Sequence, residues 1–216
     1  DESSPMVDAR LQDGSRINAA IRPVAVDGPL VSIRKFAKQA FDLARLVENA
    51  TLKQPMAALL REAVKGRLSM MVSGGTGSGK TTLLNALSRF ISNRERIITI
   101  EDTAELGIAQ FEDDHPNVVE METRQANIEG VGELTMMDLT RECLRMSPDR
   151  VVVGEVRGAE ALYMLKAMSQ GNDGSMCTVH ADSARGVADR VRGYVAEGTD
   201  IPIPVIDGFY RNAVHL

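Results

Sequence analysis

The stretch at residues 73–82, Ser-Gly-Gly-Thr-Gly-Ser-Gly-Lys-Thr-Thr, has the residue types and the spacing of a phosphate-binding loop. It fits the pattern G-x-x-x-x-G-K-[ST], in which glycines let successive backbone N–H groups turn toward a phosphate. Lys80 can reach the outer phosphates of a nucleotide, and the Thr81 hydroxyl can bind magnesium. We therefore predict a site for a nucleoside triphosphate and Mg²⁺ that is formed by Gly75, Thr76, Gly77, Ser78, Gly79, Lys80, Thr81 and Thr82.

The residues on either side of this loop predict the strand and the helix that such a loop needs. The apolar run at 68–72 has the length of a buried strand, and apolar residues recur at helical spacing from Lys80 to Ile91. The start of that helix adds a positive dipole that favours phosphate. The loop alone does not specify the reaction, because kinases, GTPases and motor proteins share it.

Three further polar clusters each follow an apolar run that is typical of a buried strand: Glu101 to Glu105, Glu155 to Arg157, and His180. Each cluster alone is also typical of a solvated turn, a helix cap or a histidine with a structural role. The carboxyl ends of parallel strands, however, meet at one edge of a sheet, where the sites of α/β proteins lie. We therefore predict that these clusters and the glycine loop form a single site.

Strand-like and helix-like segments alternate along most of the chain, which predicts an α/β fold with a mainly parallel sheet. The 216 residues, 44% of them hydrophobic, suffice for one such domain and part of another. The net charge of −5 argues against a surface that binds nucleic acid directly. No apolar run reaches the ~18 residues that span a bilayer, so we expect a soluble, cytoplasmic protein. Cys143 and Cys177 lie in apolar segments and are expected to be buried free thiols.

The beginning of the chain is expected to be the end of a separate domain. Alternating residues around Asp13-Gly14-Ser15 predict a β-hairpin within residues 1–26, and two strands alone cannot bury a sheet face. The stretch at 27–36 is predicted to be a linker, in which Asp27-Gly28-Pro29 is either a hinge or a plain connector. Residues 37–216 then form the nucleotide-binding domain, expected to be truncated at its C-terminal end, with 213–216 as an interrupted strand.

At this point the chain resembles the family of secretion and type IV pilus motor ATPases, whose four boxes stand here in the same order and spacing. They are the Walker A loop (74–81), an acidic box (99–106), a Walker B box ending in Gly-Glu (151–157) and a histidine box (174–181). Short segments at 122–124, 127–130 and 147–150 are most similar to the branch that assembles tight-adherence (Flp) pili, often called CpaF. The resemblance covers nearly the whole chain and implies a RecA-like P-loop NTPase domain, preceded by the end of a small α+β N-terminal domain.

The resemblance also implies roles for individual residues. Lys80 binds the β- and γ-phosphates of ATP, Thr81 holds Mg²⁺, and Glu155 replaces the usual Walker B aspartate near the metal. Glu105 polarises the attacking water, although the choice between Glu101 and Glu105 as the base stays open. His180 senses the γ-phosphate, and Arg124, with arginines such as Arg16 or Arg22, supplies positive charge. Asn172 stands where many relatives carry a second histidine. The candidate catalytic residues are thus Glu101, Glu105, Arg124, Glu155 and His180, with Thr81 and Glu155 as the metal ligands.

The resemblance implies an ATP-hydrolysing motor that works as a homohexameric ring and powers the assembly of a tight-adherence pilus or a related secretion system. Such a motor associates peripherally with the cytoplasmic face of the inner membrane through a membrane platform protein. A type IV secretion ATPase that moves DNA or effector proteins is an alternative with the same nucleotide chemistry. A P-loop kinase or GTPase is the third reading, against which stands the lack of an Asn-Lys-x-Asp guanine signature in the sequence.

Overall fold

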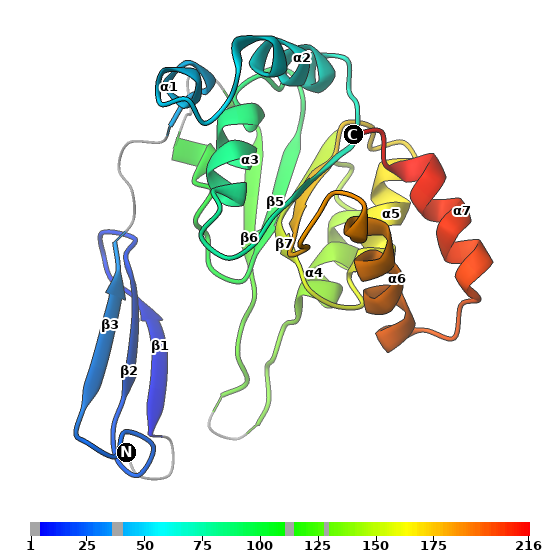
Figure 1. The fold of residues 1–216 in the computed structure, drawn as a ribbon. Helices are drawn as coiled ribbons and strands as arrows, with labels where there is room; N and C mark the ends of the chain where they lie inside the picture. The colour runs from blue at the N-terminus through cyan, green and yellow to red at the C-terminus, as the bar shows by residue number, and fades with distance from the viewer. Residues whose placement is uncertain (1–4, 36–40, 111–114, 128–129) are drawn as a thin grey trace. The chain divides into compact units, whose positions relative to one another are not determined.

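A computed structural model of the protein describes residues 5–35, 41–110, 115–127 and 130–216. The chain forms two compact units, Asp1–Ala40 and Phe41–Leu216. All of the candidate catalytic and nucleotide-binding residues belong to the second unit, shown with the first in Figure 1.

The first unit is a three-stranded antiparallel sheet in the order β1-β2-β3. Its strands are β1 (Met6–Arg10), β2 (Arg16–Ala20) and β3 (Leu30–Arg34). β1 and β2 form the hairpin that the alternating sequence pattern predicts, and Gly14 takes a φ of 85° in the turn between them. Glycine adopts this left-handed conformation at little cost, which explains the position of the turn.

The third strand corrects the linker predicted at 27–36. Leu30–Arg34 pairs with β2 along its whole length, from Leu30 opposite Ala20 to Arg34 opposite Arg16. The backbone of these residues is therefore bonded into the sheet and is not a free connector. The first unit runs to Ala40, beyond residue 26 where the N-terminal piece was predicted to end, and residues 36–40 lie outside the described part of the chain.

The second unit is built on a five-stranded parallel sheet in the order β4-β8-β7-β5-β6. This confirms the predicted α/β fold with a mainly parallel sheet. Buried apolar residues run almost without interruption through β5 and β7, as expected for strands covered on both faces. The strands are β4 (Met70–Ser73), β5 (Ile97–Glu101), β6 (Val118–Glu122), β7 (Arg150–Val156) and β8 (Met176–Val179).

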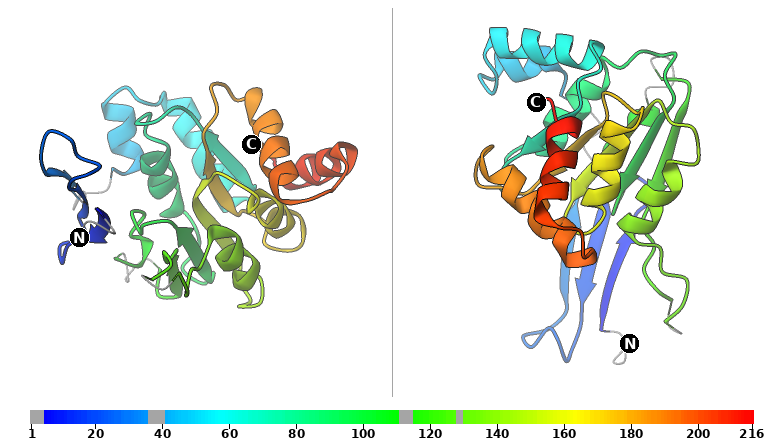
Figure 2. Two further views of the ribbon diagram at one scale, coloured as in Figure 1. Left: turned by 90° about the horizontal axis from the view of Figure 1, so that it is seen from below. Right: turned by 90° about the vertical axis from the view of Figure 1, so that its right-hand side faces the viewer.

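Helices cover both faces of this sheet, and Figure 2 shows the layers from two further directions. Alternate residues of β7 point to opposite faces, so that Val152 packs with α1 to α3 while Val151 and Val153 pack with α4 to α7. The helices are α1 (Leu43–Glu48), α2 (Gln54–Lys65), α3 (Lys80–Ser88), α4 (Met136–Cys143), α5 (Ala161–Ser169), α6 (Gly186–Gly198) and α7 (Ile203–Ala213), with a 3₁₀ turn at Ile108–Gln110.

The end of the chain differs from one local expectation. The last helix, α7, carries Pro204 in its first turn, where a proline is accepted because its missing N–H needs no partner. Residues 213–216 form no strand, although the N–H groups of His215 and Leu216 both donate to the Ser69 carbonyl beside β4. Cys143 and Cys177 are buried free thiols, as predicted.

A buried ion pair joins the amino ends of the central strands. The guanidinium of Arg150, only 1% exposed, donates to Glu95 from Nε at 2.7 Å and from Nη2 at 3.0 Å, and to the Gly174 carbonyl at 3.2 Å. Arg67 donates to the same carboxylate at 2.6 Å. These bonds link the segments that precede β5, β7 and β8, and so they help to set the strand register that continues to the opposite edge. In the part of the chain that the structure describes, no helix combines the length and the apolar character needed to cross a membrane.

Candidate functional site

The strand register brings the predicted polar clusters to one edge of the parallel sheet. Ser73, the last residue of β4, lies opposite Val179 of β8, so the glycine loop and His180 emerge side by side. Ile100 lies opposite Val153, which places the acidic segment after β5 next to Gly154 and Glu155. The clusters share an edge, as predicted, because the four strands that they follow are neighbours in the order β4-β8-β7-β5.

The glycine loop has the conformation that its sequence requires. Gly77 and Gly79 take φ values of 72° and 91°, and a Cβ on Gly74 would lie 2.5 Å from the Ser78 hydroxyl. Lys80 opens α3 and donates from Nζ to the Gly75 carbonyl at 3.0 Å. The same ammonium lies 3.8 Å from Oε1 of Glu155, which comes from β7. Lysine and carboxylate are therefore neighbours in space, although 75 positions separate them in the sequence.

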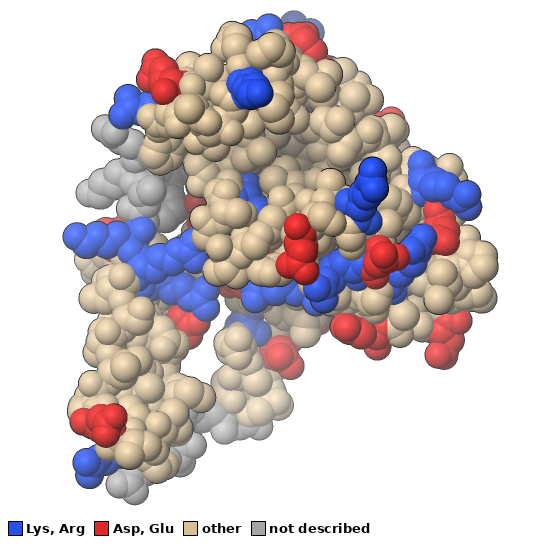
Figure 3. All heavy atoms as spheres, in the orientation of Figure 1, with Lys and Arg blue, Asp and Glu red and all other residues tan. Residues whose placement is uncertain are grey.

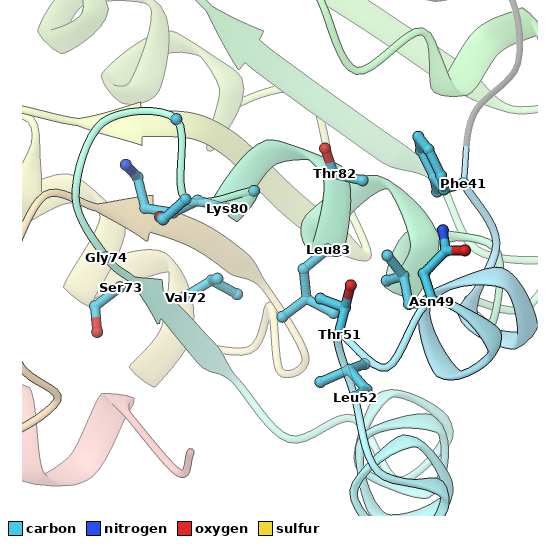
Figure 4. A pocket seen from close by; sticks show the side chains of 14 residues that line it. Phe41, Asn49, Thr51, Leu52, Val72, Ser73, Gly74, Lys80, Thr82 and Leu83 are labelled. Carbon is cyan, nitrogen blue, oxygen red and sulfur yellow. The ribbon is translucent and has the colours of Figure 1, made fainter.

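A cavity of about 400 Å³ lies beside the loop, and Figure 4 shows the residues that line it. The glycine loop and Lys80 form one end. Phe41 and Asn49 lie at the end away from Lys80, and Leu52 and Leu83 add apolar surface between them. This combination fits a nucleotide, because the loop offers N–H groups to phosphates while the apolar end can accept a base and sugar.

Glu101 is enclosed beneath the acidic loop that follows β5. It is 4% exposed, and its Oε1 accepts bonds from the N–H groups of Glu105 and Leu106, both at 3.1 Å. Gly154 leaves room for it, because a Cβ there would lie 2.8 Å from Glu101 Cγ. Burial raises the pKa of Glu101 to about 7, while the two N–H bonds act in the opposite direction. Glu105 itself is half-buried.

Arg157 joins the two acidic clusters; the sequence placed it in the cluster that begins with Glu155 but gave it no catalytic or binding role. Its Nε lies 2.9 Å from Oε2 of Glu155, and its Nη2 donates to the carboxylate of Asp102. Glu155 is therefore shared between Lys80 and Arg157. The place of Arg157 at the end of the Walker B box, two residues after Glu155, is the sequence signal for its position near the site. Its pairing with Asp102 depends on the strand order.

Arg124 and His180 differ in where the structure places them. His180 is half-buried and directly follows β8 beside the glycine loop. Arg124 lies beyond β6, where its backbone forms a bridge with Leu134 and its guanidinium lies near Gly132. Arg16 lies in the first unit and bonds Asp8 at 3.0 Å. Part of the segment that suggested the tight-adherence branch, Ile128 and Glu129, is outside the described residues.

Within the described residues, no cluster of three or more His, Cys, Asp or Glu side chains could hold a metal. The donors near the loop are the hydroxyl of Thr81 and the carboxylate of Glu155. These hard oxygen ligands suit Mg²⁺, which usually keeps waters and takes further oxygens from a substrate phosphate. The residues present therefore fit magnesium that arrives with a nucleotide better than a resident metal.

Comparison with known proteins identifies the family of the chain. The family model described as type II/IV secretion system protein matches residues 1–206. A putative conjugal transfer protein of Mycobacterium tuberculosis is 41% identical over 204 residues, covering 92% of this chain and 56% of that protein. The chain thus spans little more than half the length of that relative.

Solved structures of secretion and pilus ATPases have the same fold as this chain. The VirB11 ATPase of the Brucella suis type IV secretion system, determined with sulphate, has a TM-score of 0.64 at 29% identity over 99% of this chain and 70% of its own. The pilus retraction motor PilT with bound ADP has a TM-score of 0.68 at 20% identity, covering 97% of this chain and 56% of that one, and supports the fold alone. With its P-loop at the edge of a RecA-like parallel sheet, the chain belongs to the family of type II/IV secretion system proteins.

Proposed function

We propose that this chain is the nucleotide-binding core of a motor that hydrolyses ATP. The observation that carries the proposal is the meeting of Lys80 and Glu155, 3.8 Å apart, beside a cavity that the glycine loop lines. Two charged groups from α3 and β7 converge at the edge where α/β proteins bind their ligands. Membership of a family that includes secretion ATPases supports ATP as the substrate.

The residues of the site can divide the work of phosphoryl transfer, which depends on placement and charge neutralisation. Lys80 is oriented by the Gly75 carbonyl and by Glu155, and it neutralises the outer phosphates. Thr81 and Glu155 would hold Mg²⁺, which would supply further charge neutralisation when bound. Arg157 holds the Glu155 carboxylate through its other oxygen and thereby limits its rotation.

The water that attacks the γ-phosphate is oriented by Glu105, which lies on the loop above Glu101. His180 follows β8, the strand next to β4 and the P-loop, and we assign it the sensing of the γ-phosphate. Arg124 lies on a separate loop, and we assign it the supply of positive charge across a subunit boundary in a ring. Phe41, Leu52 and Leu83 receive the nucleoside.

At the level of the cell, we propose that the motor forms a homohexamer that works with an inner-membrane platform protein at the cytoplasmic face of the membrane. Nucleotide-driven motion of the first unit relative to the ATPase unit would power assembly of a tight-adherence pilus. The motif segments at 122–124 and 147–150 support this assignment. No direct contact with nucleic acid is required.

A second candidate is a type IV secretion motor that moves DNA or effector proteins. The observation that favours it is the similarity to a putative conjugal transfer protein and to VirB11 of a type IV secretion system. Both candidates use the same ATP chemistry. Deleting the gene in its host separates them, because loss of surface pili supports the first and loss of DNA or effector transfer with intact pili supports the second.

The nucleotide site is tested by thermal unfolding with ATP and Mg²⁺. At 100 times its dissociation constant, a ligand stabilises the folded state by about 2.7 kcal/mol, or about 5–10 °C for a unit of this size. We expect this shift in the wild type and in Lys65→Ala, an exposed lysine on α2, and its loss in Lys80→Ala. An unchanged shift in Lys80→Ala contradicts the proposed site, and an equal shift with GTP contradicts ATP as the specific substrate.

A further inference from the structure

The loop that carries Glu105 is held from two sides at adjacent backbone groups. Glu101 at the end of β5 accepts the N–H groups of Glu105 and Leu106, each at 3.1 Å. The amide Nδ2 of Asn85 donates to the carbonyl of Leu106. Asn85 belongs to α3, the helix that begins with Lys80, so the second contact ties the acidic loop to the P-loop helix.

These contacts are buried. Glu101, Asn85 and Leu106 are 4%, 8% and 2% exposed. Hydrogen bonds are electrostatically stronger in such surroundings than in water, and the loss of one partner leaves the other unsatisfied. The loop is therefore fixed relative to α3 by the side chains and not by its own backbone alone.

We propose that Glu101 and Asn85 are positioning residues that hold Glu105 at a fixed place relative to the P-loop, and that Glu101 is not the catalytic base. The inference rests on the proposed ATPase function. It goes beyond that function because it gives Asn85 a role and decides between the two glutamates.

The geometry of Glu101 argues against a base. A general base must come within hydrogen-bond reach of the water it activates. Glu101 lies packed against Gly154, where even a methyl group would come within 2.8 Å of its Cγ, and its Oε1 already accepts two N–H groups. Glu105, on the same loop, is half-buried, so part of its side chain stays accessible, whereas Glu101 is enclosed.

Burial of the Asn85 amide costs free energy of folding, and its hydrogen bond to Leu106 offsets this cost. Its Oδ1 is buried, and among the described residues it has no hydrogen-bond partner. An apolar side chain of similar size would fill this space without leaving a polar atom unsatisfied. The bond that the amide donates to the loop therefore explains why an asparagine occupies this buried position.

The first test compares steady-state ATP hydrolysis by the full chain and its variants. Glu101→Gln keeps an oxygen that can accept the two N–H groups, so we expect at least a third of the wild-type kcat. Glu101→Ala and Asn85→Ala are expected to lower kcat tenfold or more, with KM for ATP changed less than threefold. Glu105→Gln is expected to abolish turnover.

Asn172→Ala is the matched control, because Asn172 also donates from its side-chain amide to a backbone carbonyl, that of Pro148, but in a loop after α5. We expect its kcat to stay within twofold of wild type. If Glu101→Gln loses as much activity as Glu105→Gln, Glu101 is the base and the proposal is wrong. An equal loss in Asn172→Ala, or a change in KM alone, also overturns it.

Amide hydrogen exchange tests, without relying on activity, whether Glu101 and Asn85 hold the loop in place. The N–H groups of Glu105 and Leu106 should exchange slowly in the wild type and in Glu101→Gln, and at least tenfold faster in Asn85→Ala and Glu101→Ala. Equal exchange rates of these two amides in all variants would refute the proposal that Glu101 and Asn85 hold the loop. A wild-type chain that binds and hydrolyses no ATP would refute the proposed function instead, and the exchange rates would still decide whether these residues hold the loop.

Discussion

Replacing Glu95 with leucine removes the carboxylate that faces the buried guanidinium of Arg150 at the amino edge of the parallel sheet. Four contacts are lost: the bonds from Arg150 at 2.7 and 3.0 Å, the bond from Arg67 at 2.6 Å, and the bond from the Ser92 N–H at 3.3 Å. Arg150 is 1% exposed and cannot turn into water without disturbing Gly174, which lies against its guanidinium. Breaking a buried pair from one side costs about 3–5 kcal/mol, because a charge stays buried and unpaired.

The expected cost corresponds to a fall in Tm of about 6–20 °C, at roughly 2–4 °C per kcal/mol for a unit of this size. Urea unfolding followed by circular dichroism measures the change in the free energy of unfolding, with Glu62→Leu as the control. Glu62 pairs with Arg61 at 2.8 Å on the exposed surface of α2, and such pairs contribute about 0–1 kcal/mol.

A double variant separates the lost charge pair from lost packing. Arg150→Met in the Glu95→Leu background removes the unpaired charge and should recover part of the stability. A Glu95→Leu cost below about 1 kcal/mol, or losses that simply add in the double variant, would show that the ion pair does not hold these strands together.

The remaining predictions concern pH and catalysis. Although burial of Glu95 opposes ionisation, Arg150 and Arg67 hold its pKa below the ordinary value. The stabilising effect of Glu95 is therefore complete above about pH 5 and is lost at lower pH. The difference in unfolding free energy between wild type and Glu95→Leu should shrink on acidification, and a constant difference would contradict this cause. Glu155→Gln should still be stabilised by ATP but hydrolyse it at least a hundredfold more slowly, and wild-type turnover would remove Glu155 from the mechanism. Phe41→Ala should raise KM for ATP about fivefold, the effect of about 1 kcal/mol of lost apolar contact, with kcat unchanged; an unaltered KM would place the nucleoside elsewhere.

The shared sheet edge of the candidate site was predictable because the signals for it are local. The glycine pattern predicts a P-loop from eight consecutive residues, and each polar cluster stands directly after an apolar run of strand length. Once the strands are parallel and adjacent, Glu155 and His180 must share the edge with Lys80. No knowledge of side-chain packing is needed for that conclusion.

The features that could not be predicted depend on pairing between residues far apart in the sequence. Leu30–Arg34 was assigned to a linker because an extended segment does not reveal its partner, which here is β2. The bridge from Arg157 to Asp102 depends on the packing order of β5 and β7. The different environments of Glu101 and Glu105, four residues apart, arise because the loop turns its own N–H groups back onto the first carboxylate.

A structure of the protein with Mg²⁺ and an ATP analogue that is not hydrolysed tests the proposed nucleotide site most directly. We expect the triphosphate in the glycine loop, with Lys80 Nζ within about 2.7–3.2 Å of an outer phosphate oxygen. We also expect the metal beside Thr81 and Glu155, and Glu105 facing the γ-phosphate. A nucleotide bound away from this loop, or a γ-phosphate beyond hydrogen-bond reach of both Lys80 and the magnesium held at Glu155, would refute the proposed site.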